Sequence, residues 1–299
     1  MAPPDRPVPA VLSIAGSDSG GGAGIQADLK AFARSGVHGM TAITAITAQS
    51  TVAVDAVHPV PPEVIVAQVR AVAEDIGVDA VKIGMLGTAA TVRAVREALE
   101  LLEAGTPIVI DPVMVAESGA ILLDDEARRA IVDELLPLAA VITPNLPEAR
   151  VLVGEAGHGA GAGPPHGAGG TDDAEVLARA LHALGPAAVV VTGGHRDEAT
   201  DVFFDGEELH RIAGSRHRDG AAHGSGCTHS SALAAHLALG YEPLEAARAA
   251  REIAGAAVRD GLRGLGAGPG PVDVFDLTGS RAAGAVGASD GPLAARRVT

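Results

Sequence analysis

Short apolar runs along the chain alternate with longer segments in which apolar residues recur every three or four positions. The first run, from Val8 to Gly16, is followed by a glycine-rich loop and then by a helical pattern over 23–36. Short runs rich in β-branched residues indicate strands, whereas the longer periodic segments indicate helices. The predicted strands are 8–16, 38–50, 52–60, 78–84, 106–114, 139–145 and 187–194, with a hairpin over 200–214; the predicted helices are 23–36, 61–76, 88–105, 172–184, 228–240 and 243–263.

The order of these elements predicts an α/β fold. Strands alternate with helices through most of the chain, which is the pattern of a central, mostly parallel β-sheet flanked by helices on both faces. No boundary separates two complete blocks, so we expect a single domain over 8–278. The segment 154–170 is dominated by Gly, Ala and Pro without periodicity and predicts a flexible insertion, and 279–299 predicts a flexible tail.

Composition limits the classes of partner. The 299 residues carry a formal net charge of −15, which argues against nucleic acid. No stretch approaches the roughly 20 apolar residues of a membrane-spanning helix. The first ten residues lack a secretion-signal pattern and the chain has one cysteine, so we expect a cytoplasmic protein without a membrane partner. The only lysines are Lys30 and Lys82, and neither belongs to a Walker A phosphate loop.

The single cysteine, Cys227, stands in "HGSGC", directly before a helical pattern. Glycines allow backbone amides to converge, and a helix N-terminus adds partial positive charge, so Gly224, Ser225, Gly226 and Cys227 form the best candidate for a phosphate site. A thiol at such a position is expected to have a lowered pKa and to act as a base or a hydrogen-bond donor. The alternative is a buried cysteine with a structural role only.

Polar residues at the ends of predicted strands form a second candidate. Asp111 ends "VIDP", and Asn145 and Glu148 lie in "ITPNLPE". Open α/β sheets bind ligands at the carboxyl ends of their strands, and oxygen ligands suit Mg²⁺ bound to a nucleotide. Together with the glycine-rich segment around Cys227, these residues indicate phosphoryl transfer. As an alternative, each of the three could simply cap a helix or lie in its first turn.

Other patterns leave alternatives open. Gly22, Gly24 and Ala27 match the G-x-G-x-x-G/A pattern of a dinucleotide fold, but the preceding loop is too long and the second strand does not end in an acid. His229 and His236, seven residues apart, could share a metal site, although no third ligand is in register. Gln49 ends a strand and carries both a donor and an acceptor, which suits the edge of an aminopyrimidine; the alternative is an ordinary polar residue at a strand end.

These motifs combine into a resemblance to one family. The segments "IAGSDSGGGAGIQADLKAF", "TAITAQST", "VHPVPPE", "VKIGMLG", "DPVMVAESG", "VITPNLPEA", "TGGH" and "HGSGCTHSSALAA" occur in the order of the hydroxymethylpyrimidine/phosphomethylpyrimidine kinases of thiamine biosynthesis. The resemblance extends from Val11 to Val272. It implies a ribokinase-like fold, a homodimer, and the use of MgATP to phosphorylate 4-amino-5-hydroxymethyl-2-methylpyrimidine to its monophosphate and then to the diphosphate.

The resemblance also implies roles for individual residues. Cys227 would be the catalytic base, in an anion hole with Gly224, Ser225 and Gly226. The pyrimidine would be bound by Gln49, Asp28, Gly16, Met85 and Val113. ATP would be bound by Asp111, Asn145, Glu148, Thr192 and Gly194, with Asp111 and Glu148 also at the magnesium ion.

The chain departs from the usual family pattern at Glu117, Thr192 and Ala222. These departures concern the nucleotide side more than the pyrimidine side. Two other activities remain as alternatives: a pyridoxal kinase, because related enzymes share the cysteine-type anion hole, and a pyrimidine-binding module without catalysis.

Overall fold

The fold is built on a large, mostly parallel sheet. The computed structural model describes residues 6–116, 119–120, 122–157, 171–193, 199–217 and 220–279. Within this part of the chain, eight strands form a sheet in the order β10-β9-β8-β7-β6-β5-β1-β2, and β3 and β4 form a separate two-stranded sheet. The strands are β1 (Ala10–Ala15), β2 (His38–Ile43), β3 (Ala45–Gln49), β4 (Val54–Pro59), β5 (Ala80–Ile83), β6 (Ile108–Ile110), β7 (Val141–Ile142), β8 (Ala188–Val191), β9 (Asp201–Phe204) and β10 (Leu209–Ile212).

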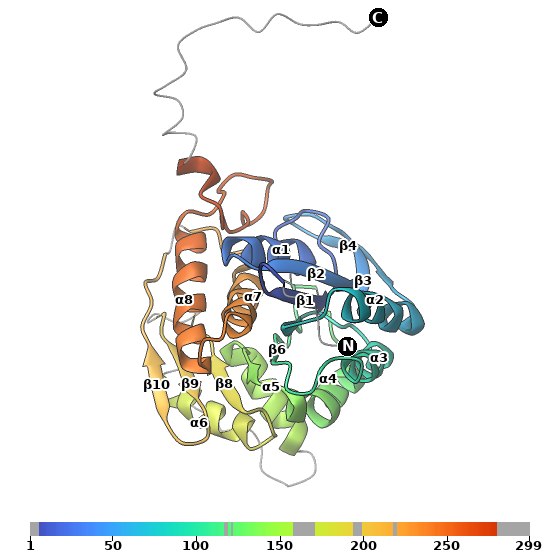
Figure 1. The fold of residues 1–299 in the computed structure, drawn as a ribbon. Helices are drawn as coiled ribbons and strands as arrows, with labels where there is room; N and C mark the ends of the chain where they lie inside the picture. Colours follow the sequence, from blue (N-terminus) through green and yellow to red (C-terminus); the bar gives the residue numbers. More distant parts are fainter. Residues whose placement is uncertain are drawn as a thin grey trace, which may run out of the picture.

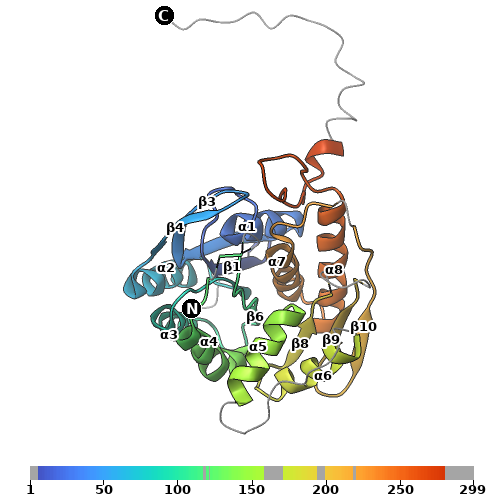
Figure 2. The same ribbon diagram turned by 180° about the vertical axis from the view of Figure 1, so that it is seen from behind.

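Helices cover both faces of the main sheet. They are α1 (Gly24–Arg34), α2 (Pro62–Asp75), α3 (Ala89–Leu99), α4 (Asp125–Ala130), α5 (Leu146–Gly157), α6 (Thr171–His182), α7 (Ser225–Ala238) and α8 (Pro243–Arg259). A π-helical turn, η1 (Ile131–Leu135), and a 3-10 turn, η2 (Leu136–Leu138), continue α4. Helices α1, α7 and α8 pack on one face and the others on the opposite face, with α7 against β1, β5 and β6, and α8 beside α7 and in contact with β9 (Figures 1 and 2).

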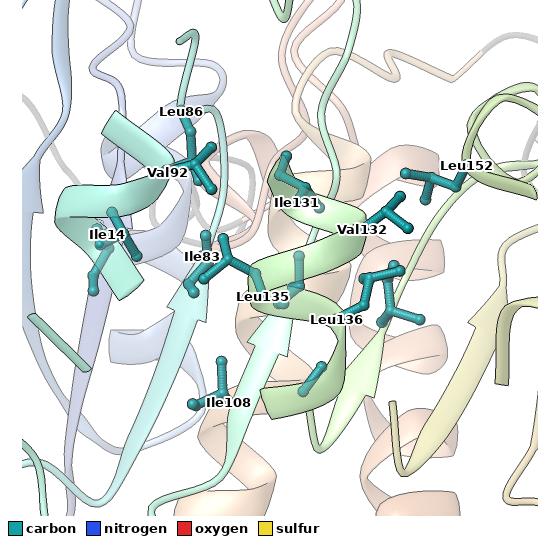
Figure 3. Close-up of a cluster of buried hydrophobic side chains, with 14 of the residues drawn as sticks. Ile14, Ile83, Leu86, Val92, Ile108, Ile131, Val132, Leu135, Leu136 and Leu152 are labelled. Carbon is teal, nitrogen blue, oxygen red and sulfur yellow. The ribbon is translucent and has the colours of Figure 1, made fainter. Parts of the chain in front are cut away.

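The six strands from β8 to β2 are parallel, and β9 and β10 are antiparallel additions at one edge. Every residue of β1, β5, β6, β7 and β8 is buried, as expected for parallel strands with helices on both faces. Figure 3 shows the larger core cluster, in which Ile83 and Ile108 of the sheet face Leu135 and Leu136 of the α4–η1–η2 segment. This arrangement confirms the predicted α/β architecture.

The prediction of one continuous strand over 38–50 is wrong. The chain forms β2 up to Ile43 and β3 from Ala45, and these strands belong to different sheets. Between them, the buried Thr44 donates its hydroxyl to the Met85 carbonyl oxygen at 2.8 Å and its amide to the Ala15 carbonyl oxygen at 3.0 Å. The alternation of apolar and polar residues continues through both strands, so the sequence pattern alone does not reveal the break.

The predicted insertion is also partly incorrect, because α5 extends to Gly157 and so includes its first four residues. Residues 158–170 and 280–299, which hold the rest of the predicted insertion and nearly all of the predicted tail, lie outside the described residues. Helix α4 and the turns η1 and η2 were not predicted. Within the described residues we find no helix with the length and hydrophobicity needed to cross a bilayer.

Candidate active site

A cavity of about 400 Å³ lies at the edge of the main sheet where the parallel strands end. Gly16 follows β1, Met85 follows β5, Asp111 follows β6 and Thr192 follows β8, and all four residues line the cavity. Open α/β sheets bind ligands at this edge. The volume falls in the range of small-molecule sites, roughly 300–1,000 Å³.

The N-terminus of α7 forms one wall of the cavity. Gly224 precedes the helix with φ of +83°, and a Cβ at this position would lie 1.7 Å from the Gly22 carbonyl oxygen, so only glycine fits. Within the described part of the chain, neither the Gly226 amide nor the Cys227 amide donates to a backbone carbonyl. Two free amides at a helix N-terminus favour a bound anion such as a phosphoryl group.

The thiol of Cys227 is half-buried in the same wall. Burial raises its pKa to about 12; Lys82 and the Gly24 amide oppose this shift, while the carboxylates of Asp28 and Asp111 add to it. The expectation of a lowered pKa is therefore wrong, because desolvation and two negative charges outweigh the helix N-terminus. In the protein without ligand, Cys227 is a protonated thiol at neutral pH.

Lys82 is a residue of this site to which the sequence analysis gave no role. It is fully buried in β5, and its Nζ lies 2.9 and 3.1 Å from the two Asp28 oxygens and 4.0 Å from Asp111 Oδ2. Burial alone would lower its pKa, but the charges of Asp28, Cys227 and Asp111 raise it above the ordinary value. The sequence signal that could have identified Lys82 is a lysine inside the otherwise apolar strand "AVKI", since lysine is almost never buried without a partner.

Asp28, which was expected to line the pyrimidine pocket, lies beneath the cavity and not on its wall. It is fully buried, and it accepts hydrogen bonds from Ser13 Oγ at 2.6 Å and from Ser231 Oγ at 2.8 Å in addition to Lys82. All of its contacts are therefore with the protein. Asp28 balances the charge of Lys82.

Asp111 and Glu148 form a pair of acids at the cavity. Ser230 Oγ donates to Asp111 Oδ2 at 2.9 Å, and burial raises the pKa of Asp111 although Lys82 opposes the shift. Glu148 and Asn145 exchange hydrogen bonds of 2.9 Å, each side chain accepting from the backbone amide of the other, and this capping box begins α5. Burial and the negative charge of Asp111 raise the pKa of Glu148 to about 8.

These acids fit a magnesium ion only in combination with a ligand. Among the described residues, no group of three or more His, Cys, Asp and Glu side chains is arranged to hold a metal. Magnesium, however, is usually held by one or two carboxylates together with phosphate oxygens and water. Burial raises the pKa of both Asp111 and Glu148, so ionising both acids is costly, and a bound divalent cation would offset that cost.

The N-terminal glycine loop is closed around a carboxylate of the chain itself. The amides of Gly20, Gly22 and Ala23 donate to Asp18 at 2.8, 3.0 and 2.8 Å, and His223 Nε2 lies 3.0 Å from Asp18 Oδ2. Converging amides of this kind bind anions, and here Asp18 occupies them. A dinucleotide fold would need such amides for the pyrophosphate, so the loop does not support that alternative.

The structure brings most of the predicted site residues to the wall of this one cavity. They are Gly16, Gln49, Met85, Asp111, Val113, Asn145, Glu148, Thr192, Gly224, Ser225, Gly226 and Cys227, together with Ala222. Gly194 and Glu117 fall outside the described residues.

The two histidines considered for a metal site are separated. His229 lines the cavity. His236 Nδ1 lies 2.7 Å from the Ala232 carbonyl oxygen, and its ring packs edge-on against Tyr241.

Replacing Glu148 with glutamine is expected to stabilise the protein in the absence of ligand. Glutamine keeps the capping box but removes a charge that is buried near Asp111. Because the folded-state pKa is raised from 4.5 to about 8, the cost of ionisation appears as the pH rises above 4.5 and grows towards pH 8. We expect Glu148→Gln to gain on the order of 4 kcal/mol at pH 8 and nothing at pH 4, measured by urea unfolding. A loss of stability at pH 8 would contradict this.

Comparisons with known proteins show the family to which the chain is similar. The family described as phosphomethylpyrimidine kinase matches residues 18–273. A hydroxymethylpyrimidine/phosphomethylpyrimidine kinase of Rhizobium meliloti is 48% identical over 269 residues, which cover 88% of this chain and 96% of the relative.

Two solved structures are similar over most of their length. An ADP complex of Bacillus subtilis pyridoxal kinase has a TM-score of 0.78 at 38% identity, covering 91% of this chain and 99% of that one. A phosphomethylpyrimidine kinase of Clostridium difficile has a TM-score of 0.69 at 40% identity, covering 82% and 96%. The family match and these identities, over nearly the whole fold, show that the chain belongs to the phosphomethylpyrimidine kinase family of phosphotransferases.

Proposed function

We propose that the protein uses MgATP to phosphorylate the hydroxymethyl group of 4-amino-5-hydroxymethyl-2-methylpyrimidine and then phosphorylates the monophosphate to the diphosphate, in thiamine biosynthesis. The observation that carries this proposal is the pair of free amides at Gly226 and Cys227, which shares one cavity with the acids Asp111 and Glu148. Phosphoryl transfer depends mainly on positioning and on charge neutralisation, and this arrangement supplies both. The Rhizobium meliloti relative bears the name of this activity.

Different residues along the cavity would bind the pyrimidine, the transferred phosphoryl group and the magnesium ion. Gln49 would hydrogen-bond the aminopyrimidine, with Met85 and Val113 packing against its ring. The amides of Gly226 and Cys227 would hold the oxygens of the transferred phosphoryl group, where negative charge develops. Magnesium would neutralise the phosphate charge, held by Asp111 and Glu148.

Cys227 lies where the substrate hydroxyl would meet the phosphoryl group. Its raised pKa indicates a protonated thiol in the absence of ligand. The thiol would therefore donate a hydrogen bond as the substrate binds. Because the thiol keeps its own proton, the hydroxyl proton would pass late in the transfer to an oxygen of the transferred phosphoryl group, which suits a transition state with little demand on a base.

Pyridoxal kinase activity is the second candidate, because the Bacillus subtilis pyridoxal kinase is 38% identical with a TM-score of 0.78. Pyridoxal also carries a hydroxymethyl group on a flat heterocycle. Both substrates should therefore be offered to the enzyme in parallel.

We also propose that the protein is a homodimer. The face of the two-stranded sheet that carries Ile46 supports this, because Ile46 is 54% exposed and its cross-strand neighbour His58 is exposed as well. Multi-angle light scattering would give the molar mass in solution.

The test of the activity is incubation of the purified protein with ATP, Mg²⁺ and either hydroxymethylpyrimidine or pyridoxal, with products followed by mass spectrometry. The pyrimidine monophosphate followed by the diphosphate is the expected result. Pyridoxal phosphate alone would support the second candidate, and no product from either substrate would overturn both.

A further inference from the structure

Three buried polar side chains meet at the end of the cavity near β9. His229 comes from α7, Asp201 from β9 and Arg251 from α8, and all three line the cavity. His229 is 4% exposed and Asp201 is 0% exposed, and the Arg251 side chain is 12% exposed. Polar groups buried to this degree normally have hydrogen-bond partners.

In the described part of the chain, several atoms of this cluster have no hydrogen-bond partner. They are both ring nitrogens of His229, Oδ2 of Asp201 and Nε of Arg251. Asp201 Oδ2 lies 3.5 Å from His229 Nε2 and 3.7 Å from Arg251 Nε, so both side chains contact the same oxygen without a normal hydrogen bond. Burial would raise the pKa of Asp201, but His229, Arg251 and the Gly193 amide lower it, so the carboxylate is ionised.

The other oxygen of Asp201 holds the chain after β8. Asp201 Oδ1 accepts a hydrogen bond of 2.7 Å from the Gly193 amide. Gly193 packs so tightly that a Cβ would lie 2.1 Å from the Thr200 carbonyl oxygen. Thr192, one residue earlier, donates its amide to the Pro144 carbonyl oxygen at 2.9 Å.

These contacts continue to the acidic part of the site. Thr192 forms a parallel bridge with Asn145, the residue that caps α5 together with Glu148. Arg251 Nη2 also donates to the carbonyl oxygen of Ala199, which is a further residue of the cavity wall. His229, Arg251 and Asp201 thus hold both described ends of the segment between β8 and β9.

The sheet order separates this cluster from the pyrimidine end. Strand β9 is four strands from β5, which precedes Met85, and five from β1, which precedes Gly16. At the usual spacing of adjacent strands this is roughly 19–24 Å. Asp111 and Glu148 follow β6 and β7, which lie in between, and the free amides begin α7, which contacts β1, β5 and β6. The β9 end of the cavity is therefore where the remainder of a nucleoside triphosphate would extend.

We propose that His229 and Arg251 are positioning residues for the nucleotide: they hold Asp201, which fixes the Gly193 amide and the wall at Thr192 against which the nucleotide binds. This inference rests on the proposed function. It predicts that the cluster controls the affinity for the nucleotide and leaves the affinity for the pyrimidine unchanged.

The test compares His229→Leu with His229→Gln, which can still donate to Asp201, and with the control His236→Leu, two turns further along α7. The readouts are the Kd for ADP from calorimetry, and separate KM values for ATP and for the pyrimidine. We expect His229→Leu to raise the ADP Kd and the ATP KM roughly tenfold, the size of the coupling between two residues in contact, with the pyrimidine KM within about twofold. His229→Gln should recover most of the ADP affinity, and His236→Leu should match the wild type.

An unchanged ADP Kd in His229→Leu, or an equal rise in both KM values, would overturn the inference. If His229→Leu does not fold, Asp201→Asn serves in its place, because it keeps an oxygen for the Gly193 amide but loses the charge that His229 and Arg251 contact. A wild-type Kd in Asp201→Asn would also overturn the inference. Failure of the proposed function would look different: the wild type would bind ADP but would form no pyrimidine phosphate.

Discussion

Replacing Cys227 with alanine lowers kcat by roughly 10²-fold or more while the KM for ATP stays within a factor of about two. The loss is expected because the thiol lines the same cavity as the free amides of α7 and the acids Asp111 and Glu148, where the substrate hydroxyl would react. The amides that bind phosphate belong to the backbone, so the substitution leaves them in place. Steady-state kinetics with each substrate varied separately would measure both effects.

The pKa of Cys227, raised to about 12, adds a second criterion. If the enzyme worked through a pre-formed thiolate, kcat/KM would rise steeply with pH up to that value. Because the thiol is protonated in the free enzyme, we expect no thiol ionisation in the profile between pH 6 and pH 9. Cys227→Ser should keep more activity than Cys227→Ala, since serine also donates a hydrogen bond. Equal activity of Cys227→Ala and the wild type would show that Cys227 has only a structural role.

Replacing Lys82 with methionine lowers the free energy of unfolding by roughly 3–5 kcal/mol, the usual cost of removing one partner of a buried ion pair. Lys82 is the cation that faces both Asp28 and Asp111, and Lys82 and Asp28 are fully buried. Methionine fills a similar volume but leaves two carboxylates without a counter-charge. Urea unfolding at pH 7 would measure the difference.

Lys30 provides the matched control, because it is the only other lysine and its Nζ makes one hydrogen bond, to the Gly21 carbonyl oxygen. We expect Lys30→Met to cost about 1 kcal/mol. Adding Asp28→Asn to Lys82→Met should restore part of the stability, because it removes one of the two buried carboxylate charges that Lys82→Met leaves without a counter-charge. A loss in Lys82→Met no larger than in Lys30→Met would show that Lys82 is not needed to balance these acids.

The sequence predicts the fold correctly wherever a strand or helix depends on the pattern of its own residues. The run that ends at Asp111 and the run that ends at Asn145 are short and apolar, and each forms a buried parallel strand with its polar residue at the cavity. The break between β2 and β3 at Thr44 could not be predicted from the sequence, because the buried hydrogen bonds of Thr44 are made to Ala15 and Met85, which are distant in sequence. Contacts of this kind are decided by the sheet and not by the alternation of residues.

The site divides in the same way. The glycines before α7 have a local signature, and Gly224 adopts the left-handed conformation that such a signature predicts. No local sequence signature predicts how burial and neighbouring charges together set the pKa values of the site residues. Lys82, Asp28 and Asp111 come from three separate elements. The burial of Cys227 and the charges of Asp28 and Asp111 raise the pKa of Cys227 although Lys82 opposes the shift, and Asp28 pairs with Lys82 instead of lining the cavity.

The protonated state of Cys227 also bears on how the protein responds to oxidants. Peroxides and disulfides react with the thiolate and hardly at all with the thiol. A sole cysteine at the point of phosphoryl transfer would make an enzyme vulnerable to oxidative inactivation if its pKa were low. With a pKa of about 12, the sulfur is poorly reactive at neutral pH, so we expect the burial that keeps Cys227 protonated also to protect the enzyme from losing activity in peroxide.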